Sequence, residues 1–327
     1  MQVIVPLAGK GTRLLPVTKY VPKPLIPVAG RPVLDRVMET LSALKMDELI
    51  FITGHLKEQV EEFVKENYDI PARFIEQKVQ DGTAGAVKLA EPYVNGPVLI
   101  VFVDTLFDAD LSVVDSLDVD GVIWAKEVED YQRFGVVVTD DEGNMTKIVE
   151  KPSDPISKLA NIGLYYMRDW KTLFAGINDT LENPANNGEW YLTDAFQYMI
   201  DQGRKIRALE VDGWYDCGKV ETLVETNAHV LRTGGASAVP EIEGVEIVEP
   251  VYLGADVELK NVRLGPNVSV GAGTKIEGGS IRDSLVGKNS ILKDVSTEGS
   301  LIGDDTILDG LNQSNIVASG DEVAPAR

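Results

Sequence analysis

An aliphatic residue followed by glycine recurs through the last quarter of the chain. The step occurs at Leu253-Gly254, Leu264-Gly265, Val270-Gly271, Val286-Gly287 and Ile302-Gly303. Short strands with regular turns and inward-pointing aliphatic residues are typical of a hexapeptide β-helix. We predict a short left-handed β-helix over residues 245–318, of about three coils. Its coils are expected to be irregular, because Gly271, Gly287 and Gly303 are sixteen residues apart, which is not a multiple of six.

A different pattern fills the preceding part of the chain, where strand-like and helix-like segments alternate. Continuous apolar runs predict strands, and apolar residues at helical spacing predict helices. The predicted strands are 3–5, 49–52, 72–75, 98–103, 121–125, 134–139, 145–149 and 164–167, and the predicted helices are 32–45, 55–68, 82–90, 191–202 and 219–231. Such alternation implies an α/β fold, namely a Rossmann-like mixed, mostly parallel sheet with helices on both faces.

The two patterns define a domain organisation. We expect an α/β domain over residues 1–232, a small, polar linker over 233–244, the β-helix over 245–318 and a flexible tail over 319–327. A short solenoid leaves its last coil exposed. We therefore expect the β-helix to pack against another subunit or the first domain, and the protein to be a homo-oligomer.

The start of the chain is free of acidic residues, although the whole chain has 52 acidic and 31 basic residues. Five basic residues, Lys10, Arg13, Lys19, Lys23 and Arg31, lie between Met1 and Leu34. A glycine-bearing turn follows the apolar run at 3–5, where backbone N–H groups can approach a phosphate closely. This combination predicts a site for a polyanion at the carboxyl end of the first strand.

The turn is not a P-loop, despite Gly9-Lys10-Gly11-Thr12. A P-loop needs glycine five residues before the Gly-Lys pair, and Ile4 occupies that position. Lys10 is also followed by Gly11 rather than by serine or threonine. An NTPase or kinase of the P-loop class is therefore excluded.

Composition excludes several other classes. The net charge of −21 argues against a nucleic-acid partner, because binding a phosphate backbone needs a broad basic face. A single cysteine, Cys217, rules out an intramolecular disulfide, and the two distant histidines, His55 and His229, argue against histidine-based zinc or triad chemistry. With no signal-like start and no apolar run of about 18 residues, we expect a cytoplasmic protein without a membrane partner.

The glycine-bearing turn and the segment after it resemble a known signature. Leu7-Ala8-Gly9-x-Gly11-Thr12-Arg13-Leu14 and Pro22-Lys23-Pro24-Leu25 resemble the sugar-phosphate nucleotidyltransferases, in particular the glucose-1-phosphate thymidylyltransferase and uridylyltransferase group. Further matches follow in order, at Gln77 with Gly82-Thr83-Ala84, Phe102-Val103-Asp104, Phe134-Gly135, Glu150-Lys151-Pro152 and Trp214-Tyr215-Asp216-Cys217-Gly218. The resemblance covers roughly residues 1–232, and the β-helix resembles the extension of longer family members.

The resemblance implies a role for each matched residue. The nucleotide would be bound by Leu7, Ala8, Gly9, Gly11, Thr12, Arg13, Lys23, Gln77, Gly82 and Thr83, with Gln77 reading the pyrimidine edge. Gly135, Glu150 and Asn161 would contact sugar hydroxyls, and Lys151 the sugar phosphate. Arg13, Lys23 and Lys151 would be the catalytic residues, and Asp104 and Asp216 would bind Mg²⁺.

The implied reaction joins UTP or dTTP to a sugar-1-phosphate, with glucose-1-phosphate as the expected sugar, and releases pyrophosphate. The sequence leaves the base open, because Gly-Thr-Ala after Gln77 occurs in relatives that use either nucleotide. One alternative is a bifunctional enzyme whose β-helix transfers an acetyl group, although such sites usually need a histidine and none follows His229. Another is a non-catalytic sugar-nucleotide-binding or regulatory protein, against which the combination of Arg13, Lys23, Asp104 and Asp216 argues.

Overall fold

The computed structural model describes residues 1–183, 188–239 and 241–326. The chain forms two compact units: Met1–Gly9 with Val37–Trp214, and Lys10–Arg36 with Tyr215–Arg327. Residues 10–36 and 215–232 are grouped with the C-terminal strands in this division. Separate segments of the chain thus build each unit.

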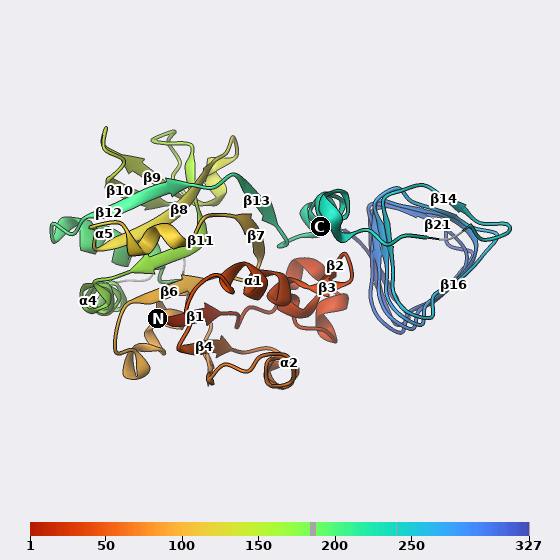
Figure 1. Ribbon diagram of the computed structural model, residues 1–327, viewed down its shortest axis with the longest axis horizontal. Coiled ribbons are helices and arrows are strands. Elements are labelled where there is room, and N and C mark those ends of the chain that lie inside the picture. Colours follow the sequence, from red (N-terminus) through yellow and green to blue (C-terminus); the bar gives the residue numbers. More distant parts are fainter. Residues whose placement is uncertain (184–187, 240, 327) are drawn as a thin grey trace. The chain divides into compact units, whose positions relative to one another are not determined.

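The first unit is built on a nine-stranded sheet (Figure 1). Its order is β10-β9-β11-β6-β1-β4-β5, and β8 pairs with β11 and β12. The strands are β1 (Gln2–Pro6), β4 (Glu48–Thr53), β5 (Ala72–Glu76), β6 (Val98–Val101), β8 (Gly121–Glu127), β9 (Gly135–Thr139), β10 (Met145–Glu150), β11 (Leu159–Met167) and β12 (Ile206–Glu210). β6, β1, β4 and β5 run parallel, and β11 joins β6 in the antiparallel sense. The predicted α/β fold with a parallel central sheet is confirmed.

Helices cover this sheet because its central strands are apolar on both faces. Ile4 and Ile50 belong to a core shared with α3 (Thr83–Lys88), α4 (Trp170–Glu182) and α5 (Leu192–Asp201). Val3 and Leu49, which point to the opposite face, are fully buried as well. α2 (Lys57–Asn67) follows β4 and α1 (Val33–Leu41) precedes it, while α4, β7 (Thr105–Asp108) and β12 were not predicted. Short 3₁₀ helices complete the unit at η4 (Glu91–Tyr93), η5 (Ser112–Asp115) and η6 (Tyr131–Arg133).

The second unit begins with the acid-free segment, which forms three 3₁₀ helices and a small hairpin. These are η1 (Thr12–Leu14), η2 (Val17–Lys19), η3 (Lys23–Leu25), β2 (Pro27–Val28) and β3 (Arg31–Pro32). The chain returns to this unit within β13 (Gly213–Asp216) and continues as α6 (Val220–Val230) and the segment η7 (Leu231–Gly235). The predicted linker at 233–244 starts at a kink in η7, where Thr233 and Gly234 have non-helical backbone angles, and Ser237 N–H bonds the carbonyl of Val251 at 2.8 Å.

Two sheets of stacked parallel strands form the rest of the second unit, and its coils superimpose as a three-sided outline in Figure 1. The first sheet contains β14 (Glu246–Ile247), β16 (Glu258–Lys260), β17 (Arg263–Leu264), β19 (Lys275–Arg282), β21 (Ile291–Glu298) and β23 (Ile307–Asp309). The second contains β15 (Val251–Leu253), β18 (Val268–Val270), β20 (Ser284–Val286), β22 (Leu301–Ile302), β24 (Ile316–Ser319) and β25 (Glu322–Pro325). The predicted β-helix is confirmed as an architecture of stacked parallel strands.

The sixteen-residue step is the length of one coil. Val270 pairs with Val286, and Val286 with Ile302, so that three of the aliphatic–glycine pairs stack on one another. Residues predicted to form a flexible tail include β25, which pairs antiparallel with β24 from Ile316↔Pro325 to Ser319↔Glu322. Among the helices of the described residues, none combines the length and apolarity needed to cross a lipid bilayer.

Candidate active site

The carboxyl ends of parallel strands β1, β4, β5 and β6 gather candidate residues at one edge of the sheet. β1 pairs with both β4 and β6, and β4 pairs with β5, all in the parallel sense. Leu7–Gly9 follows β1, Gln77 follows β5 and Asp104 follows β6. Ligands of open α/β sheets bind outside this edge. The glycine-bearing turn lies at the carboxyl end of β1, where the apolar run at 3–5 predicts it.

The loop Leu7–Gly9 is held by two contacts from neighbouring strand ends. Leu7 N–H donates to the carbonyl of Ile52 at 2.9 Å. The side-chain amide of Gln80 donates to the carbonyl of Ala8 at 2.8 Å. Gly9 is exposed, and no atom of the described residues lies within 4 Å of the position where a Cβ would be. The loop therefore has a fixed base and an open tip.

Gln77, Gly82 and Thr83 lie together between β5 and the start of α3. Gly82 has φ of 113°, and a Cβ there would lie 2.3 Å from the carbonyl oxygen of Trp190, so only glycine fits. The hydroxyl of Thr83 accepts a hydrogen bond from Leu192 N–H at 2.9 Å. Gln77 is 8% exposed and bonds Asp81 and Gly82 through its side chain.

The four predicted sugar-phosphate residues are brought together from three strands and a turn. Asn161, on β11, donates from Nδ2 to the carbonyl of Gly135, on β9, at 2.8 Å. A Cβ on Gly135 would lie 2.4 Å from Asn161 Nδ2 and 2.8 Å from Glu150 Oε2, so a side chain would displace both. Glu150 ends β10 and accepts a hydrogen bond from the hydroxyl of Thr193 at 3.2 Å.

Lys151 extends from this cluster on a backbone of unusual conformation. Its φ is +44°, a region that costs about 1 kcal/mol or more for a residue with a side chain. Its ammonium lies 3.9 Å from Glu150 Oε1 and donates to the hydroxyl of Tyr191 at 3.3 Å. The strained turn thus presents a cation beside a carboxylate and a phenol.

Burial controls the protonation of two groups in this cluster. Desolvation raises the pKa of Glu150 above its ordinary value, and the adjacent Lys151 ammonium only partly opposes that rise. Burial also raises the pKa of Tyr165, with smaller contributions from the charges of Glu150 and Asp104. Tyr165 therefore stays protonated, and its hydroxyl donates to Asn161 Oδ1. This bond leaves Asn161 Nδ2 to donate to Gly135.

In the second unit, Gly11, Thr12, Arg13 and Lys23 lie on the acid-free segment. The hydroxyl of Thr18 donates to the carbonyl of Gly11 at 2.9 Å and closes the turn that precedes η1. The side chain of Arg13 is exposed, whereas Lys23 is partly buried at the start of η3. Two cations are thus placed ten residues apart on a segment that carries no carboxylate.

Asp216 lies in the same unit as Lys23 and close to it. Its Oδ1 accepts Gly218 N–H at 2.6 Å, and its Oδ2 accepts the hydroxyl of Thr222 at 3.0 Å. A Cβ on Gly218 would lie 2.7 Å from Asp216 Oδ1 and 3.6 Å from Lys23 Nζ. Each carboxylate oxygen therefore has a protein donor and a further lone pair, as a metal ligand requires.

The two carboxylates predicted to bind Mg²⁺ fall in different units, Asp104 in the first and Asp216 in the second. Within residues 1–183, 188–239 and 241–326, no group of three or more His, Cys, Asp or Glu side chains could hold a metal ion. Mg²⁺ commonly takes only one or two protein carboxylates and completes its octahedron with substrate phosphates and water. The exposed Asp104 and the ordered Asp216 are of the chemical type that such a site needs.

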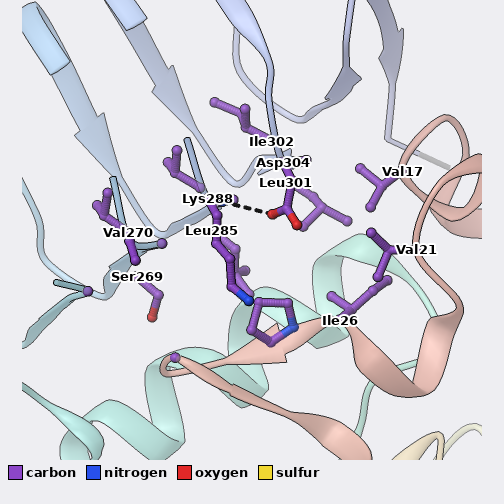
Figure 2. Close-up of a pocket in the computed structure, with 18 of the residues that line it drawn as sticks. Val17, Val21, Ile26, Ser269, Val270, Leu285, Lys288, Leu301, Ile302 and Asp304 are labelled. Carbon is purple, nitrogen blue, oxygen red and sulfur yellow. Dashed lines mark hydrogen bonds between the residues drawn. The ribbon is translucent and has the colours of Figure 1, made fainter. Parts of the chain in front are cut away.

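The second unit also contains a cavity of about 330 Å³. Val17, Val21 and Ile26 of the acid-free segment line it on one side. Leu285, Leu301 and Ile302 of the β-helix line it on the other (Figure 2). No predicted site residue is among the described residues that line it. Its mainly apolar wall is unsuited to a triphosphate, so we do not assign the reaction to it.

Several residues of the site were given no role from the sequence. Gln80 bonds the carbonyl of Ala8, and Thr193, Tyr165 and Tyr191 bond Glu150, Asn161 and Lys151. The partners are separated by 72, 43, 4 and 40 residues. Only the i,i+4 spacing of Asn161 and Tyr165 is local, and on a strand it places both on one face.

Comparisons with known proteins show the family of the chain. The family described as nucleotidyl transferase matches residues 2–233. The bifunctional protein GlmU of Methanococcus aeolicus is 35% identical over 256 residues, which are 76% of this chain and 60% of that protein. The glucose-1-phosphate thymidylyltransferase of Streptomyces antibioticus is 29% identical over 93% of this chain and 92% of its own length.

A solved structure shows the same fold. UDP-glucose pyrophosphorylase complexed with UDP-glucose superimposes with a TM-score of 0.63 and 25% identity, over 71% of this chain and 98% of that one. The chain spans 60% of the length of the Methanococcus aeolicus relative. The family match covers well over half of the sequence and includes every predicted site residue. The chain therefore belongs to the nucleotidyl transferase family.

Proposed function

We propose that this chain transfers a nucleotidyl group from UTP or dTTP to a sugar-1-phosphate, with glucose-1-phosphate as the expected acceptor. The observation that carries the proposal is the cluster around Gly135, where Glu150, Asn161 and Lys151 converge. A carboxylate and an amide are suited to sugar hydroxyls, and an adjacent ammonium is suited to a phosphate. The relative named as a thymidylyltransferase and the neighbour bound to UDP-glucose support the same chemistry.

The proposed reaction needs no protein nucleophile. A phosphate oxygen of the sugar-1-phosphate attacks the α-phosphorus of the nucleotide, and a new P–O bond forms there. The bond from the α-phosphorus to the bridging oxygen of the β-phosphate breaks, and pyrophosphate leaves with that oxygen. Because the attacking phosphate is already ionised, the protein must mainly position two anions and neutralise the leaving group.

The residues divide between the two substrates. Lys151 would hold the sugar phosphate, while Glu150 and Asn161 orient the hydroxyls. Arg13 and Lys23 would neutralise the departing pyrophosphate, and the amides of Leu7, Ala8, Gly9, Gly11 and Thr12 would cradle the triphosphate. Gln77, Gly82 and Thr83 would surround the base. Mg²⁺ held by Asp104 and Asp216 would supply further neutralisation of phosphate charge when bound.

Pyrophosphate release tests this function directly. Purified protein is incubated with Mg²⁺, one of several nucleoside triphosphates and one of several sugar-1-phosphates. We expect release with UTP or dTTP and glucose-1-phosphate, and a strong loss in Lys151→Ala. Tight nucleotide binding without pyrophosphate release in any mixture would favour a non-catalytic, regulatory protein instead.

A second activity is suggested by the name of the Methanococcus aeolicus relative, which is a bifunctional protein. A β-helix that transfers an acetyl group would make this chain bifunctional too. Consumption of acetyl-CoA with an amino-sugar phosphate would support that candidate. Its absence under conditions where pyrophosphate is released would leave nucleotidyl transfer as the single activity.

We also propose a homo-oligomer formed through the β-helix. Ile291 and Ile307 are neighbours in register on β21 and β23 and are 46% and 63% exposed. Burial of such side chains against another subunit would remove apolar area from water. Light scattering at micromolar concentration tests this, and a monomer would contradict it. Ile307→Lys is the variant expected to weaken association.

A further inference from the structure

The side-chain amide of Gln77 is held in one orientation. Gln77 follows β5, and its backbone N–H donates to the carbonyl of Thr53 at 2.8 Å. Its Nε2 lies 2.9 Å from Asp81 Oδ1 and 3.3 Å from the carbonyl oxygen of Gly82. Both amide hydrogens therefore have acceptors within the protein.

Asp81 decides that orientation, because an ionised carboxylate only accepts hydrogen bonds. The NH₂ side of the Gln77 amide must face Asp81, and the reversed amide would set two oxygens against each other. No donor to Gln77 Oε1 is found in the part of the chain that the structure describes, and this atom is not among its buried, unpartnered polar atoms. The amide thus keeps a hydrogen-bond acceptor available at the surface.

Asp81 is itself fixed by its surroundings. Its carbonyl oxygen accepts Trp190 N–H at 2.8 Å, and its own N–H donates to the carbonyl of Val79 at 3.1 Å. Its carboxylate lies over Gly85 of α3, where a Cβ would be only 2.0 Å from Oδ1. Gly85 therefore provides the space in which Asp81 can reach Gln77.

We propose that Asp81 is a positioning residue that makes Gln77 present its oxygen to the base, so that the site selects pyrimidines carrying hydrogen at N3. This inference rests on the proposed function and deepens it. Uracil and thymine have an N3–H donor, which matches the acceptor on Gln77. Cytosine has an unprotonated N3, so two acceptors would face each other there. A site built to pair with an N–H rejects a base without it, because its own polar group is left unpaired.

The experiment compares UTP with CTP in the wild type and in Asp81→Asn, by steady-state kinetics with a saturating sugar-1-phosphate. The amide that this substitution introduces can donate to Gln77 Oε1, and this would let the Gln77 amide reverse and offer its NH₂ to cytosine N3. We expect kcat/KM of the wild type to be about a hundredfold higher for UTP than for CTP. In the variant this preference should be about tenfold smaller. The fall should come from a higher KM for UTP and a lower KM for CTP.

Two further variants separate this role from a structural one. Gly85→Ala displaces Asp81 without touching Gln77 and should reduce the same preference. Asp140→Asn is the matched control, because Asp140 also accepts a side-chain amide, that of Asn144 at 3.3 Å, in the turn between β9 and β10. It should leave the UTP-to-CTP ratio unchanged.

The proposal would be overturned if the ratio of kcat/KM for UTP to kcat/KM for CTP were unchanged in both Asp81→Asn and Gly85→Ala. It would also be overturned if the wild type had equal kcat/KM for the two nucleotides. The wild-type comparison decides this even if a variant fails to fold. Calorimetric titration of the protein with UTP and with CTP, without sugar-1-phosphate, separates the role of Asp81 in base selection from the proposed nucleotidyl transfer. A preference for UTP in binding without pyrophosphate release would sink the proposed reaction and leave the role of Asp81 intact.

Discussion

The side-chain oxygen of Asn227 accepts a hydrogen bond from the backbone N–H of Ala29, with nitrogen and oxygen 2.9 Å apart. The same oxygen accepts the hydroxyl of Ser269 at 2.6 Å, and Asn227 Nδ2 donates to the carbonyl of Asn267 at 3.3 Å. Asn227, on α6, is fully buried. One amide therefore ties the hairpin that follows Lys23 to the first coils of the β-helix.

Asn227→Ala should lower stability by about 2–4 kcal/mol, because it leaves the buried N–H of Ala29 without an acceptor. Ser269→Ala removes only one donor to the same oxygen and should cost about 1 kcal/mol. Urea unfolding of the full chain measures both. Because Ala29 lies six residues after Lys23, Asn227→Ala should also raise KM for the nucleotide and leave KM for the sugar phosphate unchanged. Equal stability of the two variants would contradict this account.

Lys151→Ala should raise KM for the sugar-1-phosphate by about ten- to a hundredfold, because a charge-assisted contact to the phosphate is lost. KM for the nucleotide should change little. Lys158→Ala is the matched control, since Lys158 forms an exposed ion pair with Glu129 at 2.7 Å and, among the described residues, bonds none of the cluster around Gly135 through its side chain. Steady-state kinetics with each substrate varied in turn distinguishes the two. A rise confined to the KM for the nucleotide would show that Lys151 contacts the nucleotide and not the sugar phosphate.

The pH dependence of stability should report the burial of Glu150. Because its pKa in the folded protein is raised above the ordinary value of 4.5, folding favours the protonated form. Stability is therefore lost as pH rises from about 4.5 through the folded-state pKa, and is constant above it. Glu150→Gln removes this loss.

Thermal unfolding of Glu150→Gln and wild type at several pH values checks that sign. The variant should be more stable than the wild type at pH 7. The difference in stability should shrink below pH 4, where the Glu150 carboxyl of the wild type is neutral in both the folded and the unfolded state. Its turnover should fall, because the carboxylate is proposed to orient the sugar. The opposite result would be a stability of Glu150→Gln, relative to wild type, that is lower at pH 7 than at pH 4. It would show that the contacts of Glu150 with Lys151 and Thr193 outweigh the cost of its desolvation.

Asp104→Asn should reduce pyrophosphate release by at least about a hundredfold, and more Mg²⁺ should restore part of it, because one charged ligand is removed. A chelator should abolish wild-type activity reversibly. Asp110→Asn is a suitable control, since Asp110 bonds only the nearby Ser112 at 2.6 Å among the contacts described for it. Full activity of Asp104→Asn would exclude this residue from the metal site.

Local patterns predicted most of the architecture. The apolar run at 3–5, which forms β1, and the charged segment at 55–68, which forms α2, were predicted because composition over adjacent residues is local information. The spacing of Gly271, Gly287 and Gly303 likewise revealed the coil, since each step is one turn of the solenoid. α4 escaped prediction although Asp169 caps its N-terminus by accepting Thr172 N–H at 3.1 Å.

The sequence predicted the residues of the candidate site that directly follow a strand. It did not predict the contacts between site residues that are far apart along the chain. The sequence by itself determined that Asp104 follows an apolar strand, because a run of adjacent apolar residues is local information. Only the tertiary structure placed Gln80 against Ala8 and Thr193 against Glu150. Those contacts join residues 72 and 43 positions apart and depend on strand register and on how α5 packs on the sheet, which no period in the sequence encodes.

The same distinction applies to the domain limits. The change from helical periodicity to the aliphatic–glycine step located the β-helix in the sequence. The structure groups residues 10–36 with it, through the Ala29–Asn227 bond and the cavity that Val17 and Ile26 line together with residues of the β-helix. Ala29 and Asn227 are 198 positions apart in sequence. Burial of a shared apolar surface, which is decided only when the chain is folded, brings them together.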